Sequence, residues 1–366
     1  MPQISNDSVL SALKNVYDPD LRKDLVTLKM VKDVKISDEE IDLTIELTTP
    51  ACPLKDKIKE DCISEIKKQI PSAKKINVNM TANVRSNLDE TKSSILPNVK
   101  NTIAVASGKG GVGKSTIAVN LAVALALQGA SVGLIDADIY GPSIPLMVGI
   151  QEKPRIFQDT ATMKMVPLEN YGIKLMSIGF LIDDDAPVIW RGPMASGAIK
   201  QFMSDVHWGE IDYLIFDLPP GTGDIQLTLV QTIPLSGAVV VTTPQNVSLI
   251  DVKKAIKMFQ RVNVPILGIV ENMSYFIAPD TNKKYDIFGT GGGAKLANDL
   301  SIKLLGAVPI NAKIREGGDK GLPIVIESPE TEEAKRIFDI SKNLAAEISI
   351  NTLSAKTPKV EILLGN

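Results

Sequence analysis

The sequence is poor in histidine and cysteine, the residues that most often carry nucleophilic and metal chemistry. It contains one histidine, His207, and two cysteines, Cys52 and Cys62, among 366 residues. A single histidine argues against a Ser-His-Asp triad and excludes a multi-histidine metal site within one chain. Two cysteines cannot build a disulfide framework in a chain of this length, and we expect both thiols to be reduced.

Long apolar runs and an excess of basic charge are also missing. No apolar run reaches the roughly 18 residues of a membrane-spanning helix, and the start, MPQISNDSVL, does not read as a signal peptide. The formal net charge is −3, which does not favour a nucleic-acid-binding surface. We therefore expect a cytoplasmic protein that binds neither membrane nor nucleic acid.

The length and the order of the patterns predict two domains. Residues 1–82 read as a small α+β domain, and the polar segment 83–100 reads as a linker. Residues 101–350 form the predicted second domain, and residues 351–366 form a tail. In the small domain the expected helices cover residues 8–16 and 53–70, and the expected strands cover 31–37, 39–47 and 75–80.

The second domain alternates short, fully apolar strands with helices. The strands read TIAVAS, SVGLID, YLIFDLP, GAVVVTT, PILGIVEN and LLGAVP. Strands that are apolar throughout are buried on both faces, and their alternation with helices predicts a doubly wound, mostly parallel α/β sheet. Ligands of such sheets bind at the carboxyl ends of the strands.

The stretch SGKGGVGKST, residues 107–116, lies between the first of these strands and a helix. It matches the P-loop pattern G-x-x-x-x-G-K-[ST], in which glycines let backbone N–H groups surround phosphate oxygens. Lys114 is expected to bind the β- and γ-phosphates of ATP, and Ser115 to ligate Mg²⁺. The residues predicted to bind the nucleotide here are Gly108, Gly110, Gly111, Val112, Gly113, Lys114, Ser115 and Thr116.

Acidic residues follow two other strands of the predicted sheet. Asp217 ends the strand YLIFD, where an aspartate can hold Mg²⁺ through a water molecule. Asp136 and Asp138 follow the strand SVGLID and share one side of an extended chain. Asp138 lies further past the strand, so we expect its carboxylate to position the water molecule that attacks in ATP hydrolysis. The alternative for all three is the capping of a turn.

The motif KGGVGKS, with its additional Lys109, resembles the deviant Walker A motif of the MinD/ParA class of P-loop ATPases. The segments DADIYGPSIP, PVIWRGPMASGAIKQF, DYLIFDLPPGTGD, TTPQNVSLIDV, ENMSYF and FGTGGGAKLA resemble the Mrp/ApbC branch, the iron–sulfur cluster carriers. This resemblance extends from about Asn101 to Glu347. LTTPACPLKD, residues 47–56, is similar to the hallmark of the domain in the PaaD and SufT proteins of iron–sulfur assembly.

The resemblance implies an ATP-bound homodimer in which Lys109 contacts the nucleotide of the partner subunit. The residues alone leave a second placement open for Lys109, a solvated loop side chain. By the same resemblance Lys109, Lys114 and Asp138 are the catalytic residues, Asp217 has the Walker B role and Asn272 contacts adenine.

The sequence departs from the family where the cluster ligands belong. The C-P-x-C motif expected after ENMSYF is replaced, with Ala278 and Thr281 at the two cysteine positions. Thiolates are the usual cluster ligands. Cys62 falls on the apolar stripe of its predicted helix and is expected in the core. Cys52 precedes Pro53 at the expected helix N-cap, so we predict an acidic, reactive thiol that is a candidate cluster ligand.

The favoured function is an ATP-dependent carrier or assembly factor that delivers iron–sulfur clusters to apoproteins, with apo iron–sulfur proteins and assembly scaffolds as partners. One alternative is a positioning ATPase of the MinD or ParA kind, which the tail NTLSAKTPKVEILLGN, a poor membrane anchor, does not favour. The other is a nucleotide-gated scaffold that has lost cluster binding, an alternative that rests on Ala278 and Thr281.

Overall fold

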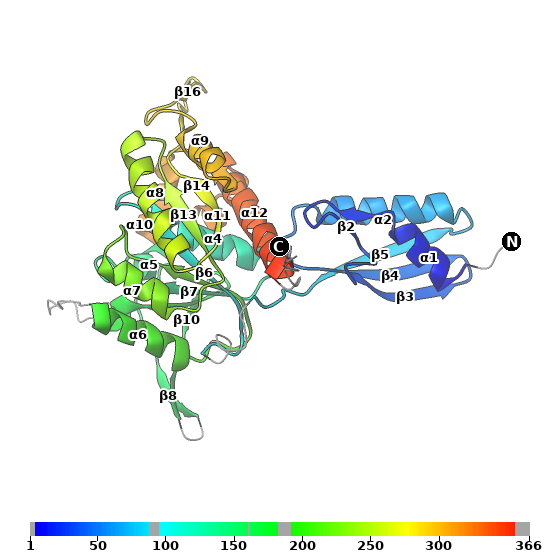
Figure 1. Cartoon of the computed structure of the whole chain (residues 1–366), viewed down its shortest axis with the longest axis horizontal. Coiled ribbons are helices and arrows are strands. Elements are labelled where there is room, and N and C mark those ends of the chain that lie inside the picture. The colour runs from blue at the N-terminus through cyan, green and yellow to red at the C-terminus, as the bar shows by residue number, and fades with distance from the viewer. Residues whose placement is uncertain (1–3, 88–94, 160–161, 182–191, 356–366) are drawn as a thin grey trace, which may run out of the picture. The chain divides into compact units, whose positions relative to one another are not determined.

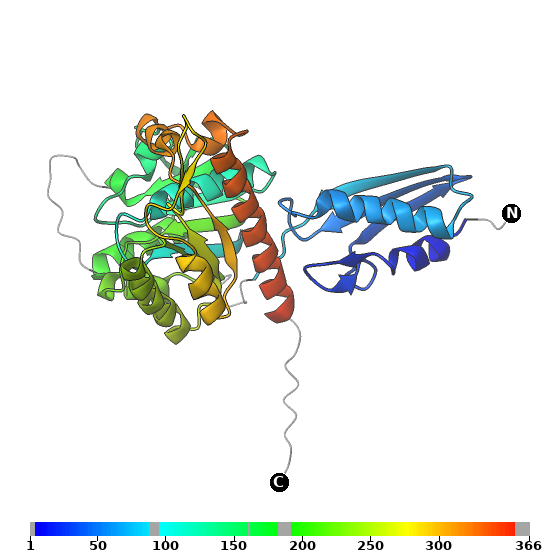
Figure 2. The same ribbon diagram turned by 90° about the horizontal axis from the view of Figure 1, so that it is seen from above.

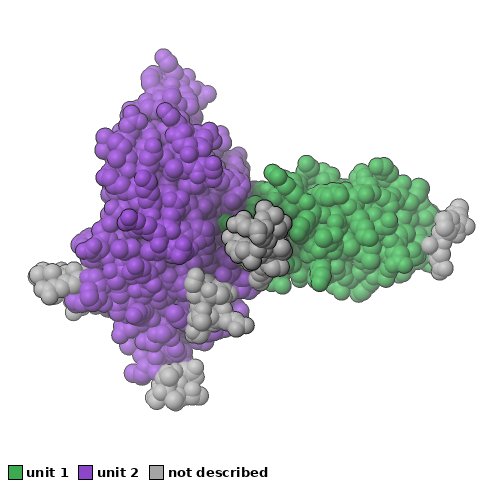
Figure 3. All heavy atoms as spheres, viewed as in Figure 1, with its two compact units in different colours: residues 1–85, 349–366 green, residues 86–348 purple. Residues whose placement is uncertain are grey.

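The computed structural model describes residues 4–87, 95–159, 162–181 and 192–355. The chain divides into two compact units, one comprising residues 1–85 and 349–366 and the other residues 86–348 (Figure 3). The expected boundary at residue 350 therefore falls inside α12, a helix that spans Glu332–Ala355. Most of the predicted tail and part of the predicted linker lie outside the described residues.

The smaller unit is a three-stranded sheet with two helices on one face (Figure 1). Its sheet has the order β3-β4-β5, antiparallel between β3 and β4 and parallel between β4 and β5. Alternate residues of β4 are buried, since only one face is covered. Its elements are α1 Asn6–Leu13, β1 Tyr17–Asp18, β2 Lys23–Asp24, β3 Val31–Ser37, β4 Glu40–Leu47, α2 Lys55–Gln69 and β5 Lys75–Ala82.

The core of this unit contains the predicted helical stripe. Ile58, Cys62 and Ile66 of α2 are at most 1% exposed and pack with the buried residues of α1 and β4. The side chains that recur every four residues in α2 thus pack against those that recur every two residues in β4, and together they form one apolar layer. The prediction of a buried Cys62 is confirmed.

In the larger unit, the described residues form an eight-stranded sheet of order β10-β11-β7-β12-β6-β13-β14-β17. All of its strand pairs are parallel except β10 with β11. Helices cover both faces (Figures 1 and 2). The predicted doubly wound α/β sheet is confirmed.

The six predicted strands are confirmed in this sheet. Five of them are buried almost throughout because helices cover both faces of the sheet, whereas the edge strand β17 has one buried residue of four. The strands of the unit are β6 Val99–Ser107, β7 Val132–Asp136, β8 Ile156–Asp159, β9 Thr162–Met165, β10 Leu168–Asn170, β11 Ile173–Ser177, β12 Ile211–Asp217, β13 Gly237–Thr242, β14 Ile266–Glu271, β15 Phe276–Ile277, β16 Lys284–Tyr285 and β17 Leu304–Ala307. Its helices are α4 Lys114–Leu127, α5 Ile144–Met147, η1 Ile178–Leu181, α6 Gly192–Ser204, α7 Asp224–Thr232, α8 Asn246–Arg261, α9 Gly292–Asp299, α10 Ala312–Lys320, α11 Ile324–Glu327 and α12.

Candidate nucleotide-binding site

The P-loop connects the end of β6 to the start of α4, as predicted. Gly113 is the N-cap of α4 and has a φ of 79°, in the left-handed region, and no side chain caps the helix. The first N–H groups of α4 are therefore available to an anion at the positive end of the helix dipole. This backbone fits the phosphates of a nucleotide.

Two glycines of the loop are required by close packing. A Cβ atom on Gly113 would lie 2.2 Å from Nδ2 of Asn272, and one on Gly108 would lie 2.4 Å from the carbonyl carbon of Asp251. Asn272 Nδ2 also donates a hydrogen bond to the Val112 carbonyl oxygen at 2.9 Å. The loop is thus fixed against the ends of β14 and α8, which holds its N–H groups in place.

The side chains that follow the loop meet an aspartate at the end of β12. Lys114 Nζ lies 2.6 Å from Oδ1 of Asp217 and 3.4 Å from Oδ2 of Asp138. Ser115 Oγ donates to Oδ2 of Asp217 at 2.6 Å. Residues from three strand ends are therefore brought together, as the sequence predicted for Lys114, Ser115, Asp138 and Asp217.

Three carboxyl groups lie around a single ammonium group in this site. Asp136 and Asp217 are neighbours in the parallel register of β7 and β12, and both are fully buried. Burial, together with the charge of Asp217, raises the pKa of Asp136 to about 8. Burial also raises the pKa of Asp217, and Lys114 partly offsets this rise. The hydroxyl of Ser115 and the carboxylate of Asp217 lie side by side next to the P-loop, and both are oxygen donors of the kind that Mg²⁺ prefers.

The alternative role that the sequence offered for the three aspartates, capping of a turn, is confirmed for Asp136 and Asp138. Asp136 accepts hydrogen bonds from the Ile144 and Asp138 N–H groups and from the Ser177 hydroxyl. Asp138 accepts one from the Tyr140 N–H at 3.2 Å. Asp136 therefore orders the turn that carries Asp138, whose other carboxylate oxygen faces Lys114.

Lys109 is not part of this cluster. Its side chain is half-exposed, and its carbonyl oxygen accepts a hydrogen bond from Ser107 Oγ at 2.9 Å. Within the described part of the chain, no hydrogen bond or ion pair links its ammonium to Lys114 or to the three aspartates. Both placements that the sequence left open for Lys109 remain compatible with this position.

A cavity of about 610 Å³ opens beside Gly113 and Asn272. It has room for a nucleoside, and Asn272 lies on its wall as predicted for a residue near adenine. Met273, also on the wall, has a φ of 54°, an uncommon conformation that persists where packing requires it. Sequence reasoning missed the residues of this wall that follow β16 and β17, namely Ile287, Phe288, Pro309, Ile310, Asn311, Ile314 and Arg315.

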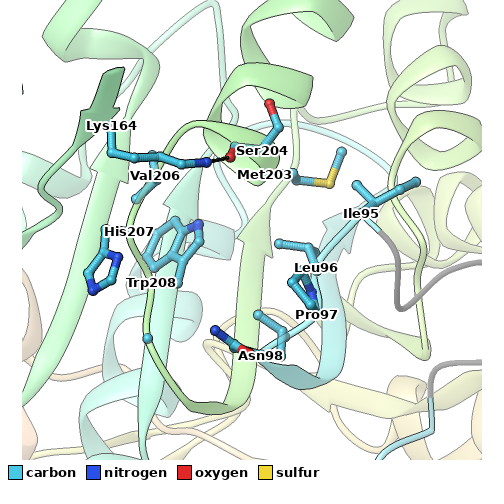
Figure 4. Close-up of a pocket in the computed structure, with 12 residues that line it drawn as sticks. Ile95, Leu96, Pro97, Asn98, Lys164, Met203, Ser204, Val206, His207 and Trp208 are labelled. Atoms are coloured by element: carbon cyan, nitrogen blue, oxygen red, sulfur yellow. Dashed lines mark hydrogen bonds between the residues drawn. The ribbon is translucent and has the colours of Figure 1, made fainter. Parts of the chain in front are cut away.

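A second cavity, of about 180 Å³, lies at the amino ends of β6 and β12, opposite the P-loop edge of the sheet (Figure 4). Its wall includes Leu96, Trp208 and the one histidine, His207. Lys164, which also lines it, donates to the Ser204 carbonyl oxygen at 2.5 Å (Figure 4). Because its lysine is already paired and its volume is small, we do not assign the nucleotide to this cavity.

The prediction of an acidic Cys52 at a helix N-cap is wrong. Helix α2 begins at Lys55 with Leu54 as its N-cap, so Cys52 lies in the turn before it. The side chain packs against the core of the small unit, and burial raises its pKa to about 11. Burial likewise raises the pKa of Cys62 to about 12. Both cysteines are therefore protonated thiols at neutral pH.

The positions of the family's cluster cysteines lie in the β15–β16 hairpin, where Ala278 is 9% exposed and Thr281 is exposed. No group of three or more His, Cys, Asp or Glu side chains within the described ranges is arranged to hold a metal ion. Part of the segment PVIWRGPMASGAIKQF, residues 187–191, lies outside the described residues. None of the described helices has the length and hydropathy needed to cross a membrane.

The parallel sheet, the P-loop and the Lys114 cluster define a P-loop NTPase. The chain belongs to the ParA family described as NUBPL iron-transfer P-loop NTPase, which matches residues 98–345, and the family described as iron-sulfur cluster assembly protein matches residues 6–80. The resemblances found in the sequence are thereby confirmed for both halves.

Full-length relatives share both parts. A protein of Synechocystis named iron-sulfur cluster carrier protein is 51% identical over 352 residues, covering 96% of this chain and 99% of the relative. A protein of Escherichia coli with the same name is 45% identical and covers 95% of this chain and 93% of the relative. A nucleotide-binding protein of Archaeoglobus fulgidus, solved with ADP, superposes with a TM-score of 0.58 at 38% identity, covering 67% of this chain and 95% of that one.

Proposed function

We propose that this chain binds and hydrolyses ATP as a nucleotide-gated homodimer and uses the cycle to deliver iron–sulfur clusters to apoproteins. The observation that carries the ATPase part is the contact of Lys114 and Ser115 with Asp217 at the start of α4. Cluster delivery is supported by membership of the iron-transfer family and by relatives named cluster carriers.

In the proposed reaction the N–H groups of the P-loop and the Lys114 ammonium bind the phosphates of ATP. Ser115 and Asp217 would hold Mg²⁺, which would supply positive charge beside the phosphate oxygens. Asp138 orients the water molecule that attacks the γ-phosphorus, since its carboxylate lies 3.4 Å from Lys114 Nζ. ADP leaves as the bond to the γ-phosphorus breaks. The half-exposed Lys109 contacts the nucleotide of the partner subunit.

The thiolates for the cluster are proposed to come from a partner protein. The chain has no cysteine at 278 or 281, and burial holds the pKa values of both of its thiols at about 11 or above. A cluster usually takes four cysteine thiolates, and one chain has two cysteines in all, so it cannot supply every ligand of a cluster by itself. This favours a carrier that handles its cluster together with a partner protein that supplies thiolates.

The test combines transfer with reconstitution. A scaffold protein loaded with a cluster is mixed with an apo-ferredoxin, and visible absorption follows transfer with the chain present, with and without ATP and Mg²⁺. We expect ATP to change the transfer rate in the presence of this chain. In parallel, anaerobic reconstitution with iron and sulfide should leave the parent and Cys52→Ser equally without stoichiometric cluster. A parent that binds cluster while Cys52→Ser does not would return the cluster site to the small unit.

A further inference from the structure

Helices α5 and α10 form two adjoining walls of the nucleoside cavity. The residues that these helices contribute to its lining are Leu146, Met147, Ile314, Arg315, Gly318 and Asp319. The helices meet where they end, because a Cβ atom on Gly321, the C-cap of α10, would lie 2.4 Å from the Cα atom of Gly149. The shape of the cavity therefore depends on how the ends of these two helices are held.

The turn between β10 and β11 is hydrogen-bonded to both helix ends. Asn170 Nδ2 donates to the carbonyl oxygen of Val148, the C-cap of α5, at 2.7 Å. The Tyr171 hydroxyl donates to the carbonyl oxygen of Gly321 at 2.8 Å. Neither Asn170 nor Tyr171 lines the cavity. The two side chains therefore act on the cavity through the helices that they hold.

Tyrosine is an unfavourable residue for the place that Tyr171 occupies in this turn. Asn170 pairs with Ile173, so Tyr171 and Gly172 alone connect the two strands. Both have a positive φ, 49° at Tyr171 and 76° at Gly172. Hairpin turns of this kind favour Asn, Asp or Gly at the first position, because a bulky residue is strained at positive φ. Such strain persists where the surrounding structure requires it, and the bond to Gly321 requires a side chain as long as tyrosine.

We propose that Tyr171 is a positioning residue for the nucleoside of ATP, whose hydroxyl holds the end of α10 where the cavity wall is needed. The inference rests on the nucleotide binding proposed above and adds a residue that does not touch the nucleotide. A wall that is held before the ligand arrives need not be ordered on binding, and this preorganisation increases affinity. The phosphates bind at the start of α4 and at Lys114, so the effect of Tyr171 should be confined to the nucleoside.

Tyr171→Phe tests the proposal, because it removes the hydroxyl and keeps the ring and the turn. We expect the KM for ATP and the Kd for ADP to rise about three- to tenfold, the range that one lost hydrogen bond allows, while kcat stays within about twofold of the parent. Tripolyphosphate, which has no nucleoside, should inhibit the variant and the parent with the same Ki. Initial rates of phosphate release with Mg²⁺ give KM, kcat and Ki, and calorimetry gives the Kd for ADP.

Ser131→Ala is the matched control. Ser131 Oγ donates to the Glu210 carbonyl oxygen at 2.6 Å, next to the amino end of β7. The control therefore loses the same kind of bond, between a hydroxyl and a backbone carbonyl, at the edge of the sheet opposite the P-loop. We expect it to unfold at a lower denaturant concentration than the parent, with KM, kcat, Kd and Ki unchanged.

The outcomes separate this inference from the function on which it rests. If Tyr171→Phe unfolds more easily but keeps the KM and the Kd of the parent, the hydroxyl is structural and the inference fails alone. A Ki for tripolyphosphate that rises in proportion to KM also overturns it, because the effect then reaches the P-loop. If the parent neither binds ADP nor hydrolyses ATP, the proposed function fails and the inference fails with it.

Discussion

Lys114 Nζ lies 2.6 Å from Oδ1 of Asp217, so the lysine proposed to bind phosphate is held by the aspartate proposed to bind Mg²⁺. Both residues are buried: Asp217 has no exposed surface, and Lys114 is 6% exposed. Breaking such a pair without replacement leaves a charge uncompensated. In the proposed function, ATP and Mg²⁺ would replace the partners of both groups at once, since the phosphates would pair with the lysine and the cation with the carboxylate. The pair thus favours joint binding of nucleotide and cation.

Lys114→Ala should abolish ATP turnover while the chain still folds. The variant removes the side chain that contacts both Asp217 and, in our proposal, the phosphates, and we expect a loss of about a hundredfold or more in phosphate release. Lys335→Ala is the control, and it should hydrolyse ATP at the parent rate because Lys335 is an exposed lysine of α12 that pairs with Glu330. Hydrolysis by Lys114→Ala at the parent rate would show that the site is elsewhere.

Gly113→Ala should destabilise the chain and weaken nucleotide binding, whereas Gly110→Ala should leave stability nearly unchanged. A Cβ atom on Gly113 meets Asn272 Nδ2 at 2.2 Å on a backbone with a φ of 79°, but one on Gly110 meets its nearest atom at 4.0 Å. We expect a cost of about 1–3 kcal/mol for Gly113→Ala, from the strained conformation alone. Chemical denaturation without nucleotide measures the difference, and equal stabilities would contradict the packing described for Asn272.

The stability of the chain without nucleotide should fall between about pH 4 and pH 8 through Asp136. Folding raises the pKa of this carboxyl from its usual 3.8 to about 8, so the folded chain retains a proton that the unfolded chain releases. The stabilising contribution of this group is complete below pH 4 and is lost as the pH rises to 8. Its slope has an upper limit of about 1.4 kcal/mol per pH unit.

Asp136→Asn removes the titrating carboxyl group. The free energy of unfolding should then change less with pH, by the contribution that Asp136 makes to its slope. Denaturant unfolding from pH 5 to pH 8 in the presence of EDTA measures both chains. Asp138→Asn is the control, since Asp138 lies two residues further along the same turn. A parent and an Asp136→Asn variant with parallel pH profiles would mean that Asp136 is ionised throughout this range.

Cys52 should react slowly with a thiolate-selective reagent in the folded chain. With a pKa of about 11, about one thiol in a thousand is ionised at pH 8. Iodoacetamide labelling of Cys62→Ser should therefore accelerate steeply from pH 8 to pH 10 when the chain is folded. Unfolding in urea should increase the rate at pH 8 by at least tenfold. Rapid labelling of folded Cys62→Ser at pH 7 would restore the reactive thiol that the sequence predicted.

The local sequence pattern was sufficient to predict a strand or loop whose structure depends only on its own residues. Six of the eight strands of the main sheet are apolar runs bounded by turns and were predicted from the sequence pattern, whereas β10 and β11 were missed. The P-loop was found because its glycines, Lys114 and Ser115 act over eight consecutive residues. Asp138 and Asp217 followed from the rule that parallel strands place their carboxyl ends at one edge, and the structure brings both to Lys114.

Cys52 shows where a local rule failed. A residue before proline at an expected helix start reads as an N-cap, but α2 begins two residues after Pro53 and the thiol packs into the core of the small unit. The pKa of a thiol depends on everything that surrounds it. Desolvation by burial, together with the charges of Asp18 and Asp20, outweighs the backbone hydrogen bond at Leu54 and the charge of Lys55. No stretch of sequence around Cys52 contains that information.

By itself, then, the sequence determined six strands of the main sheet, the phosphate loop and the absence of cysteine at 278 and 281, since each depends on neighbouring residues. Only the tertiary structure decided that Lys114 pairs with Asp217, that Asp136 is buried beside it, and that residues after β16 and β17 enclose the nucleoside cavity. These contacts join segments up to about two hundred residues apart. Their distances and their burial depend on how the whole sheet packs.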